Sequence, residues 1–382
     1  MSKIRFVQCG DIHIGMPFSS FKGIFGLPEK RRRHIEETFE KIIGIAADTK
    51  SDFLIICGDL FEEKYATRSV IENMNYEFGK VSRVVMIPGN HDPFNKGSFY
   101  HRFPWRENVF VLSPERPFIE FPDLSVAFYH YNSLRESDSL GQLNLQKDRI
   151  NILMFHGTID TICTEDRYLP VTSEELERYG FDYIAAGHFH NTFLQYGKNK
   201  TIHNAGSPEP LGFDEEGIHS IITGEITKEM GHVECRAEKV QVSNRFYKTL
   251  EITTDPEMSL NEIISFVRQT LQSVEGHKDM LARILLKGRR DPKMYLDTLK
   301  IQESLVGLTL YAKVTDETLP DFDISQISKE QGIRGVFVRN VLEKMEQEPH
   351  LSSFYRSVMI YGLEALSGNR PSLTDPTEEG GR

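Results

Sequence analysis

The chain has 382 residues, enough for two or three domains of ordinary size that each bury a core. Its 45 Lys and Arg face 56 Asp and Glu, a formal charge of −11, so no overall basic field would draw it to nucleic acid or to an anionic membrane. Any binding of nucleic acid must therefore depend on a local feature.

Several classes of protein are excluded by the apolar and cysteine patterns. A stretch such as 53–57 is far below the roughly 20 residues that span a bilayer, and the N-terminus leads directly into a strand-like pattern without an apolar signal core. No CxxC pair is present, which argues against a disulfide framework or a thiolate zinc site; the cysteines are Cys9, Cys57, Cys163 and Cys235. We therefore expect a cytoplasmic protein with no membrane segment.

The first part of the chain, to about residue 225, predicts an α/β domain. Short β-branched or aromatic runs alternate with helical segments, and residues 30–50 repeat apolar side chains at helical spacing, as expected of a helix packed on a sheet. The expected strands end near Gly10, Gly58, Pro88, His130, His156 and Gly187.

The pattern changes after about Asn244 and predicts a smaller α/β domain. Its expected strands are 246–252, 281–287 and 308–314, and its expected helices are 260–274 and 295–305. Two amphipathic stretches follow, and the last residues are rich in Pro, Ser, Thr, Gly and acid. The expected domains are therefore 1–245, 246–320, a helical segment at 321–368 and a tail without fixed structure at 369–382.

Five polar motifs stand out because each follows one of the expected strands. They are Gly10-Asp11-Ile12-His13, Gly58-Asp59-Leu60-Phe61, Gly89-Asn90-His91-Asp92, Phe155-His156-Gly157 and Gly187-His188-Phe189-His190. Loops beyond the carboxyl ends of strands in α/β sheets converge on one crevice, so these motifs predict a single site.

Seven side chains in these motifs can give oxygen or imidazole nitrogen to a cation: Asp11, His13, Asp59, Asn90, His156, His188 and His190. Seven ligands suit two metal ions if one carboxylate bridges, and mixed imidazole and carboxylate ligands favour Mn, Fe or Zn over Ca or Mg. Each motif alone has an ordinary structural explanation, such as a buried histidine or a turn aspartate. The five together, in order, predict a metal site.

The order DxH, GD, GNHD, H and GHxH is similar to that of the calcineurin-like metallophosphoesterase superfamily, over residues 4 to about 225. The resemblance implies an α/β fold in which a two-sheet β-sandwich is flanked by helices. For one metal ion the implied ligands are Asp11, His13, Asp59 and His190. For the other they are Asp59, Asn90, His156 and His188, with Asp59 as the bridge.

The implied chemistry is hydrolysis of a phosphoester. Two cations roughly 3.5 to 4 Å apart make hydroxide available near neutral pH and bind the phosphoryl oxygens. The resemblance places His91 opposite the scissile phosphate, where it would stabilise the leaving alkoxide or donate a proton to it. Asp92 would either orient His91 or only support the turn.

A finer resemblance concerns the substrate. Gly58-Asp59-Leu60-Phe61 and the segment 204–211 resemble the DNA double-strand-break-repair nucleases of the SbcD and meiotic-recombination-eleven family, and the short chain resembles the YhaO-type members. This implies Mn-dependent 3′ to 5′ exonuclease and single-strand endonuclease activity, a second domain that caps DNA, a homodimer, and an SbcC-type SMC-like ATPase partner. A location at the nucleoid follows. Glu62 departs from the histidine of many family members, which puts the exonuclease polarity in question.

Two other functions stay open at this point. One is a phosphodiesterase acting on small nucleotides, with the second domain as a lid, and the other is a DNA-end tethering subunit of an ATPase complex. The local candidates for contact with DNA are residues 30–33, the aromatic loop 99–106 and the cluster Arg283, Lys287, Arg289 and Arg290. The stretch 351–366 would either pack in the core or dock on the ATPase.

Overall fold

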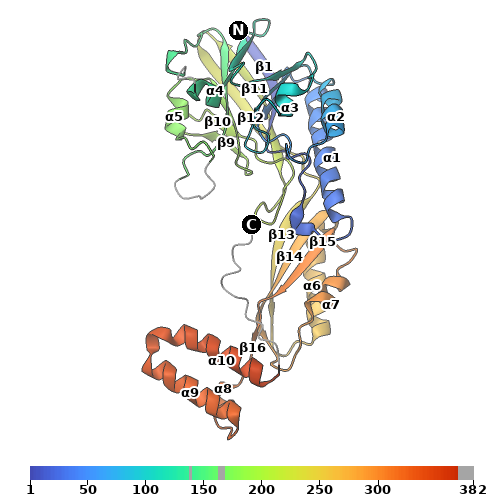
Figure 1. Cartoon of the computed structure of the whole chain (residues 1–382), viewed down its shortest axis with the longest axis vertical. Helices are drawn as coiled ribbons and strands as arrows, with labels where there is room; N and C mark the ends of the chain where they lie inside the picture. The colour runs from blue at the N-terminus through green and yellow to red at the C-terminus, as the bar shows by residue number, and fades with distance from the viewer. Residues whose placement is uncertain (137–139, 162–167, 369–382) are drawn as a thin grey trace. The chain divides into compact units, whose positions relative to one another are not determined.

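The computed structural model describes residues 1–136, 140–161 and 168–368, and the chain divides into two compact units, 1–246 and 247–382. Figure 1 shows both units, and each is considered separately below. Cys163 and the predicted tail at 369–382 lie outside the described residues. The four-part division expected from the sequence is finer than these two units, so its boundaries at 320 and 368 stay a prediction.

The first sheet of the N-terminal unit has a parallel centre and an antiparallel edge. Its strand order is β12-β11-β1-β2-β3-β4. The parallel strands are β1 (Ser2–Cys9), β2 (Phe53–Cys57), β3 (Val84–Ile87) and β4 (Val109–Val111). The antiparallel hairpin is β11 (Ser220–Glu229) and β12 (His232–Gln241), and it pairs with β1 through β11.

The second sheet has the same plan, in the order β5-β6-β7-β8-β10-β9. Its parallel strands are β6 (Val126–His130), β7 (Ile150–His156), β8 (Tyr183–Gly187) and β10 (Ile202–Asn204). Antiparallel strands close both edges, β5 (Phe118–Phe121) on β6 and β9 (Phe193–Tyr196) on β10.

Helices lie on the outer faces of the two sheets. On one side of this unit Figure 1 shows α1 (Leu27–Asp48) and α2 (Arg68–Phe78), and on the other α4 (Tyr131–Glu136) and α5 (Ser173–Glu177). The short elements are α3 (Phe99–Arg102) and the 3-10 turns η1 (Ser19–Phe21) and η2 (Leu140–Gln142). No helix in the described residues is both long and apolar enough to cross a lipid bilayer.

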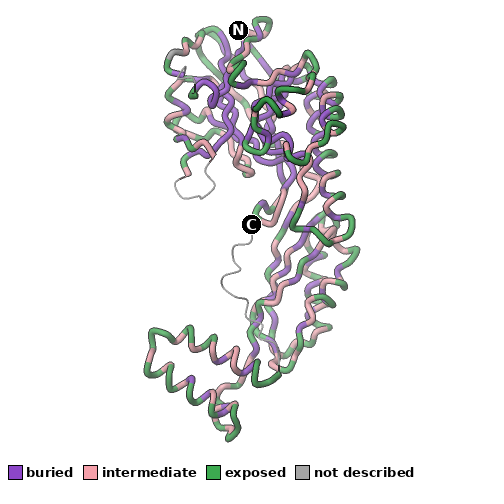
Figure 2. The backbone as a smooth tube through the Cα atoms, viewed as in Figure 1, coloured by how far each residue is buried: buried purple, intermediate pink, exposed green. Residues whose placement is uncertain are grey.

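The core of this unit lies between the two sheets. Every residue of β2, β3, β6, β7 and β8 is buried, as expected for parallel strands covered on both faces. Phe53, Phe128 and Met154 belong to one buried cluster drawn from both sheets, and Figure 2 shows buried residues concentrated along these strands. The predicted fold class, two sheets flanked by helices in an α/β chain, is confirmed.

The sequence analysis missed the strands β4, β5 and β9 to β12. In β12 most residues are exposed, so the alternation that marks a half-buried strand is weak, and charged side chains occupy much of it. Its partner β11 pairs with β1, more than two hundred residues earlier. A local sequence pattern cannot predict a strand pairing at that separation.

The C-terminal unit contains a smaller sheet in the order β13-β14-β15, with β16 also paired to β14. The strands are β13 (Phe246–Thr254), β14 (Met280–Arg290), β15 (Tyr311–Asp316) and β16 (Leu319–Pro320). The helices are α6 (Leu260–Gln272) and α7 (Thr298–Ser304), with the turn η3 (His277–Asp279). Ser259 and Glu262 form a capping box at the start of α6, which fixes where that helix begins.

Three helices complete this unit: α8 (Ile324–Ile327), α9 (Ile333–Gln347) and α10 (Ser352–Leu366), with the turn η4 (Pro349–Leu351). Val338, Met359 and Leu363 form the buried centre of the α9–α10 hairpin. Arg290 at the end of β14 pairs with Glu364 of α10 at 2.5 Å, and both side chains are buried. This ion pair fastens the hairpin to the sheet.

A buried ion pair of the N-terminal unit makes a stability prediction. Arg31 is fully buried and donates to Glu209 at 2.8 Å, and Glu209 is 1 % exposed. Arg31→Met is expected to destabilise the protein by about 3–5 kcal/mol, because it leaves a buried carboxylate without its cation. Urea unfolding measures this change.

Arg32→Met is the matched control, since Arg32 pairs with Glu29 at the surface and its loss is expected to cost at most about 1 kcal/mol. Equal effects of the two substitutions would contradict the prediction.

Candidate metal centre

The carboxyl ends of β1, β2, β3, β7 and β8 meet at one place, and the polar motifs lie there. Three groups of side chains have ligand atoms within 4.8 Å of one another. They are Asp11, His13 and His190; His13, Asp59 and His91; and Asp11, Asp59 and His156. Five of the seven predicted metal ligands are therefore brought together in these groups.

The geometry of His156 indicates a cation position. Its Nδ1 lies 2.7 Å from the carbonyl oxygen of Cys57, so Nδ1 carries the proton and donates it. Nε2 then faces Asn90 Oδ1 at 2.9 Å and Asp59 Oδ2 at 3.4 Å. Burial disfavours the charged ring, but the charge of Asp59 outweighs burial and raises the pKa of His156 to about 9, so a positive charge is favoured between these acceptors, either as a proton on Nε2 or as a metal ion. Asn90 thus joins the cluster as the sixth predicted ligand.

His13 has the same arrangement on the other side of Asp59. Its Nδ1 lies 2.8 Å from Glu62 Oε1, and its buried Nε2 has no hydrogen-bond partner among the described residues. That Nε2 lies 3.8 Å from Asp59 Oδ2. A histidine whose Nδ1 is fixed by a carboxylate and whose Nε2 is free is the usual form of a metal-ligating histidine.

His190 repeats the pattern with a different carboxylate. Its Nδ1 lies 2.6 Å from Glu215 Oε1, and Glu215 also accepts hydrogen bonds from Ser207 Oγ at 2.8 Å and from Leu211 N at 3.2 Å. Burial disfavours the charged ring, but the hydrogen bond to Glu215 outweighs burial and raises the pKa of His190 to about 9. Glu215 thereby holds the ring with Nε2 directed away from itself.

His188 is placed differently from the other six. Its ring centre lies 5.3 Å from that of His156, and its backbone N–H donates to both oxygens of Asp11 at 3.1 and 3.0 Å. The side chain is not part of the three close groups among the described residues. Its role as a ligand of the second metal ion stays a prediction.

The backbone is strained where these ligands lie. Asp11, His13, Asp59 and His188 all have positive φ, between 50° and 94°, although none of them is glycine. Such conformations cost roughly 1–3 kcal/mol each and persist where the surrounding structure enforces them, often at functional sites. Gly187 permits the close approach of the sheets here, since a Cβ on it would lie 2.0 Å from the carbonyl oxygen of Cys57.

Two carboxylates beside His91 have separate tasks. Asp92 accepts hydrogen bonds from the backbone N–H groups of Gly89 and Leu60, at 2.6 and 2.7 Å, and from the hydroxyl of Tyr100 at 2.7 Å. It therefore supports the turn, and its hydrogen-bond partners in the described part of the chain do not include the His91 ring. The ring of His91 instead bonds to Glu62, with Nδ1 3.0 Å from Oε2.

Burial alone would raise the pKa of Glu62, but its hydrogen bonds to His13 and His91 outweigh burial and lower the pKa to about 2. Burial raises the pKa of Asp11, so its charged form needs a nearby cation. Sequence reasoning noted Glu62 only as a departure and missed Glu215 altogether. Glu215 lies 25 residues beyond His190 in a loop, with no spacing that could have indicated it.

The local candidates for contact with DNA are mostly occupied by other partners. Arg31 is in the core, and Tyr100 and Trp105 of the aromatic loop pack on each other with ring centres 6.4 Å apart. In the C-terminal unit Lys287 pairs with Glu251, and the remaining arginines bond to other groups: Arg283 to Thr249, Arg289 to Asp321 and Arg290 to Glu364. Structural explanations therefore account for Arg31, for these two rings and for the cluster.

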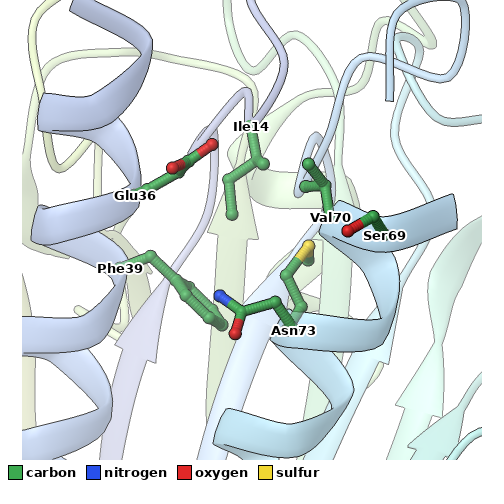
Figure 3. Close-up of a pocket in the computed structure, with 7 residues that line it drawn as sticks. Ile14, Glu36, Phe39, Ser69, Val70 and Asn73 are labelled. Carbon is green, nitrogen blue, oxygen red and sulfur yellow. The ribbon is translucent and has the colours of Figure 1, made fainter. Parts of the chain in front are cut away.

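A cavity of about 230 Å³ lies between α1 and α2, separate from the metal centre. Figure 3 shows Glu36 and Phe39 on one helix facing Ser69, Val70 and Asn73 on the other. Ile14, next to His13 in sequence, closes one side. None of the seven predicted ligands lines this cavity, so it is not the predicted site.

Removal of divalent metal is expected to lower the thermal unfolding midpoint. Binding at 100 times the dissociation constant stabilises a native protein by about 2.7 kcal/mol, because the unfolded chain does not hold the ligands together. Differential scanning calorimetry with Mn²⁺ and after dialysis against EDTA measures the shift. A midpoint that is the same under both conditions would show that the six gathered side chains hold no ion.

Comparison with known proteins agrees with this geometry. Residues 4–192 match the calcineurin-like phosphoesterase family model. The metallophosphoesterase YhaO of Bacillus subtilis is 26 % identical over 233 residues, which cover 57 % of this chain and only 56 % of YhaO. The DNA double-strand break repair protein Mre11 of Saccharolobus solfataricus is 22 % identical over 357 residues, 88 % of this chain and 89 % of that protein.

Among solved structures, an archaeal phosphodiesterase aligns with 62 % of this chain and 100 % of its own, at 16 % identity and a TM-score of 0.33. The family match covers all five motifs through His190. The resemblance predicted from these motifs is confirmed: the chain carries a calcineurin-like metallophosphoesterase domain.

Proposed function

We propose that this protein is a dimetal DNA nuclease that hydrolyses phosphodiester bonds during double-strand-break repair, as a 3′ to 5′ exonuclease and single-strand endonuclease. The family indicates a metal-dependent phosphoester hydrolase, and DNA is the finer part of the proposal. The observation that carries it is the convergence of two buried carboxylates, Asn90 and three histidines at one place, a set of ligands that suits divalent cations.

The ligands are proposed to form two sites that share Asp59. Asp59 Oδ2 lies 3.8 Å from His13 Nε2 and 3.4 Å from His156 Nε2, so one oxygen faces histidines of both proposed sites. When bound there, two divalent ions would make water nucleophilic near neutral pH and neutralise the phosphoryl oxygens. We propose Mn as the metal, with Fe or Zn as the other ions that suit these ligands.

His91 is proposed to act on the phosphate. Its side chain is 42 % exposed, whereas those of His13 and His156 are at most 2 % exposed, so His91 is open to a substrate at the rim of the site. The hydrogen bond to Glu62, foremost, raises the pKa of His91 and favours its protonated form. A protonated imidazole there would donate to the leaving oxygen or to the phosphate.

DNA is proposed as the substrate because of the relatives. Mre11 of Saccharolobus solfataricus is named a DNA double-strand break repair protein, and it matches along most of both chains. The C-terminal unit would then cap and position DNA on the metallophosphoesterase domain. We also propose a homodimer, a place at the nucleoid, and an SMC-like ATPase partner of the SbcC type.

The α9–α10 hairpin is the surface we propose for that ATPase. It has a buried centre of its own, yet Ile333 is 73 % exposed and Phe354 is 59 % exposed. Figure 2 shows exposed and intermediate residues alternating along most of this hairpin. Of the apolar stripe Leu351, Phe354, Tyr355 and Val358, the alternative of core packing applies to Tyr355 and Val358, which pack against the buried centre, but not to Phe354.

A nuclease assay tests the proposal. End-labelled duplex, single-stranded and hairpin DNA are incubated with Mn²⁺, Mg²⁺ or Zn²⁺, and bis(p-nitrophenyl) phosphate and a cyclic dinucleotide serve as small phosphodiesters. Degradation of DNA from its 3′ ends supports the proposal. Hydrolysis of the small esters without cleavage of DNA would favour the small-nucleotide phosphodiesterase. That alternative is also favoured by the basic cluster of the C-terminal unit, because Lys287, Arg289 and Arg290 are paired with acidic side chains.

A further inference from the structure

Glu62 holds two histidines with its two oxygens. Oε1 lies 2.8 Å from His13 Nδ1, and both Oε1 and Oε2 lie 3.0 Å from His91 Nδ1. The two rings are perpendicular, with an interplanar angle of 84° and centres 4.7 Å apart. A carboxylate has no proton to give here, so both Nδ1 atoms must donate to it.

The consequence is that one side chain fixes the proton positions of both rings. With Nδ1 protonated, the Nε2 lone pair of His13 is available in the buried centre, and the ring of His91, whose side chain is 42 % exposed, is held with Nδ1 on Glu62. His13 is a proposed metal ligand, and His91 is the residue proposed to contact the phosphate.

The backbone holds Glu62 in this position from both sides. Its N–H donates to the carbonyl oxygen of Ile14 at 2.9 Å, beside His13, and the N–H of the following Glu63 donates to the carbonyl oxygen of His91 at 3.1 Å. Glu62 itself is only 7 % exposed. The carboxylate therefore cannot leave one histidine for the other without disturbing both loops.

We propose that Glu62 is a positioning residue that couples metal binding at His13 to the orientation of His91. The coupling is reciprocal: an ion that fixes the His13 ring fixes the carboxylate, and the carboxylate fixes the ring of His91. This rests on the proposed roles of His13 and His91 but not on DNA as the substrate. It also gives a function to the residue at which this chain departs from the SbcD and meiotic-recombination-eleven pattern.

Glu62→Gln tests the coupling, because the neutral amide presents one acceptor oxygen and one donor nitrogen, so both rings lose their carboxylate partner and the nitrogen repels any Nδ1–H that it faces. Two readouts are needed in the full-length protein. One is Mn²⁺ affinity by isothermal titration calorimetry. The other is kcat on bis(p-nitrophenyl) phosphate at saturating Mn²⁺, with KM determined separately.

We expect Glu62→Gln to weaken Mn²⁺ binding by about 10- to 100-fold, the usual effect of losing a carboxylate behind a ligating histidine. We also expect kcat to stay reduced by at least about tenfold when Mn²⁺ is saturating, since His91 is no longer oriented. Glu215→Gln provides the contrast. Glu215 holds His190, Ser207 and the backbone of Leu211 rather than His91, so the kcat of Glu215→Gln should recover at saturating Mn²⁺.

Two further variants complete the design. Glu63→Gln makes the same chemical change one residue along and should leave Mn²⁺ affinity unchanged. Glu62→Asp keeps the charge, but its side chain is too short to reach both rings. It should therefore show both weaker Mn²⁺ binding and lower kcat, and it replaces Glu62→Gln if that variant does not fold.

A defect in only one readout would overturn the proposal. Weaker Mn²⁺ binding with full recovery of kcat would make Glu62 a partner of His13 alone, and a lower kcat with unchanged affinity would make it a partner of His91 alone. If the wild-type chain cleaves the small ester but not DNA, the nuclease proposal fails while the coupling stands. If it hydrolyses neither, ¹⁵N chemical shifts of the histidine rings decide: the shifts of both His13 and His91 must change in Glu62→Gln.

Discussion

Asp59→Ala is expected to abolish binding of both metal ions and, with them, phosphodiester hydrolysis. Asp59 is 2 % exposed, and its Oδ2 faces His13 Nε2 on one side and His156 Nε2 on the other. Removing the shared carboxylate leaves each proposed site without its central anion. The loss of affinity should exceed the roughly 10- to 100-fold that follows loss of a residue behind the ligands.

Metal content after gel filtration measures this result, by inductively coupled plasma mass spectrometry. Asp11→Ala is the control, because the family resemblance assigns Asp11 to one ion only, beside His13 and His190, although Asp11 also lies close to Asp59 and His156. We expect two ions in the wild type, one in Asp11→Ala and none in Asp59→Ala. Two ions retained in Asp59→Ala would show that the bridge is assigned to the wrong residue.

His91→Asn is expected to lower kcat by about 10²- to 10⁴-fold, the range for loss of a general acid or base. Metal content and DNA affinity should stay unchanged, because His91 lies at the rim of the site and not among the seven predicted ligands. Steady-state kinetics, metal analysis and a filter-binding assay on labelled DNA measure the three quantities.

The control for this substitution is His232→Asn, on the exposed face of β12 and away from the motifs. Its kinetics should match those of the wild type. Wild-type cleavage by His91→Asn would remove His91 from the chemistry. Lost cleavage together with unimpaired DNA repair in cells would instead favour the alternative in which the protein tethers DNA ends for an ATPase.

Much of the fold could be predicted because the central strands are parallel and buried on both faces. β2, β3, β6, β7 and β8 are continuous apolar runs, and each ends within a residue or two of the expected position. The hairpin β11–β12 could not be predicted this way. Its outer strand is exposed and charged, and its inner strand is defined by pairing with β1 at the other end of the domain.

Basic residues illustrate a different limit. Arg31 and Arg32 are neighbours of the same type, yet Arg31 is fully buried against Glu209 and Arg32 reaches Glu29 at the surface. A charged run is therefore ambiguous until the packing of its helix is known. The same holds for Arg290, whose partner Glu364 lies 74 residues away.

The sequence by itself determined the kinds of ligand and their order, because each motif follows a strand and a sheet gathers the ends of its parallel strands at one edge. Only the tertiary structure decided which carboxylate acts on which histidine. Asp92 is adjacent to His91 in the chain but is held by backbone N–H groups, while Glu62 and Glu215 reach His91 and His190 from other loops. Hydrogen bonds depend on distances of about 3 Å between atoms, and sequence separation does not set those distances.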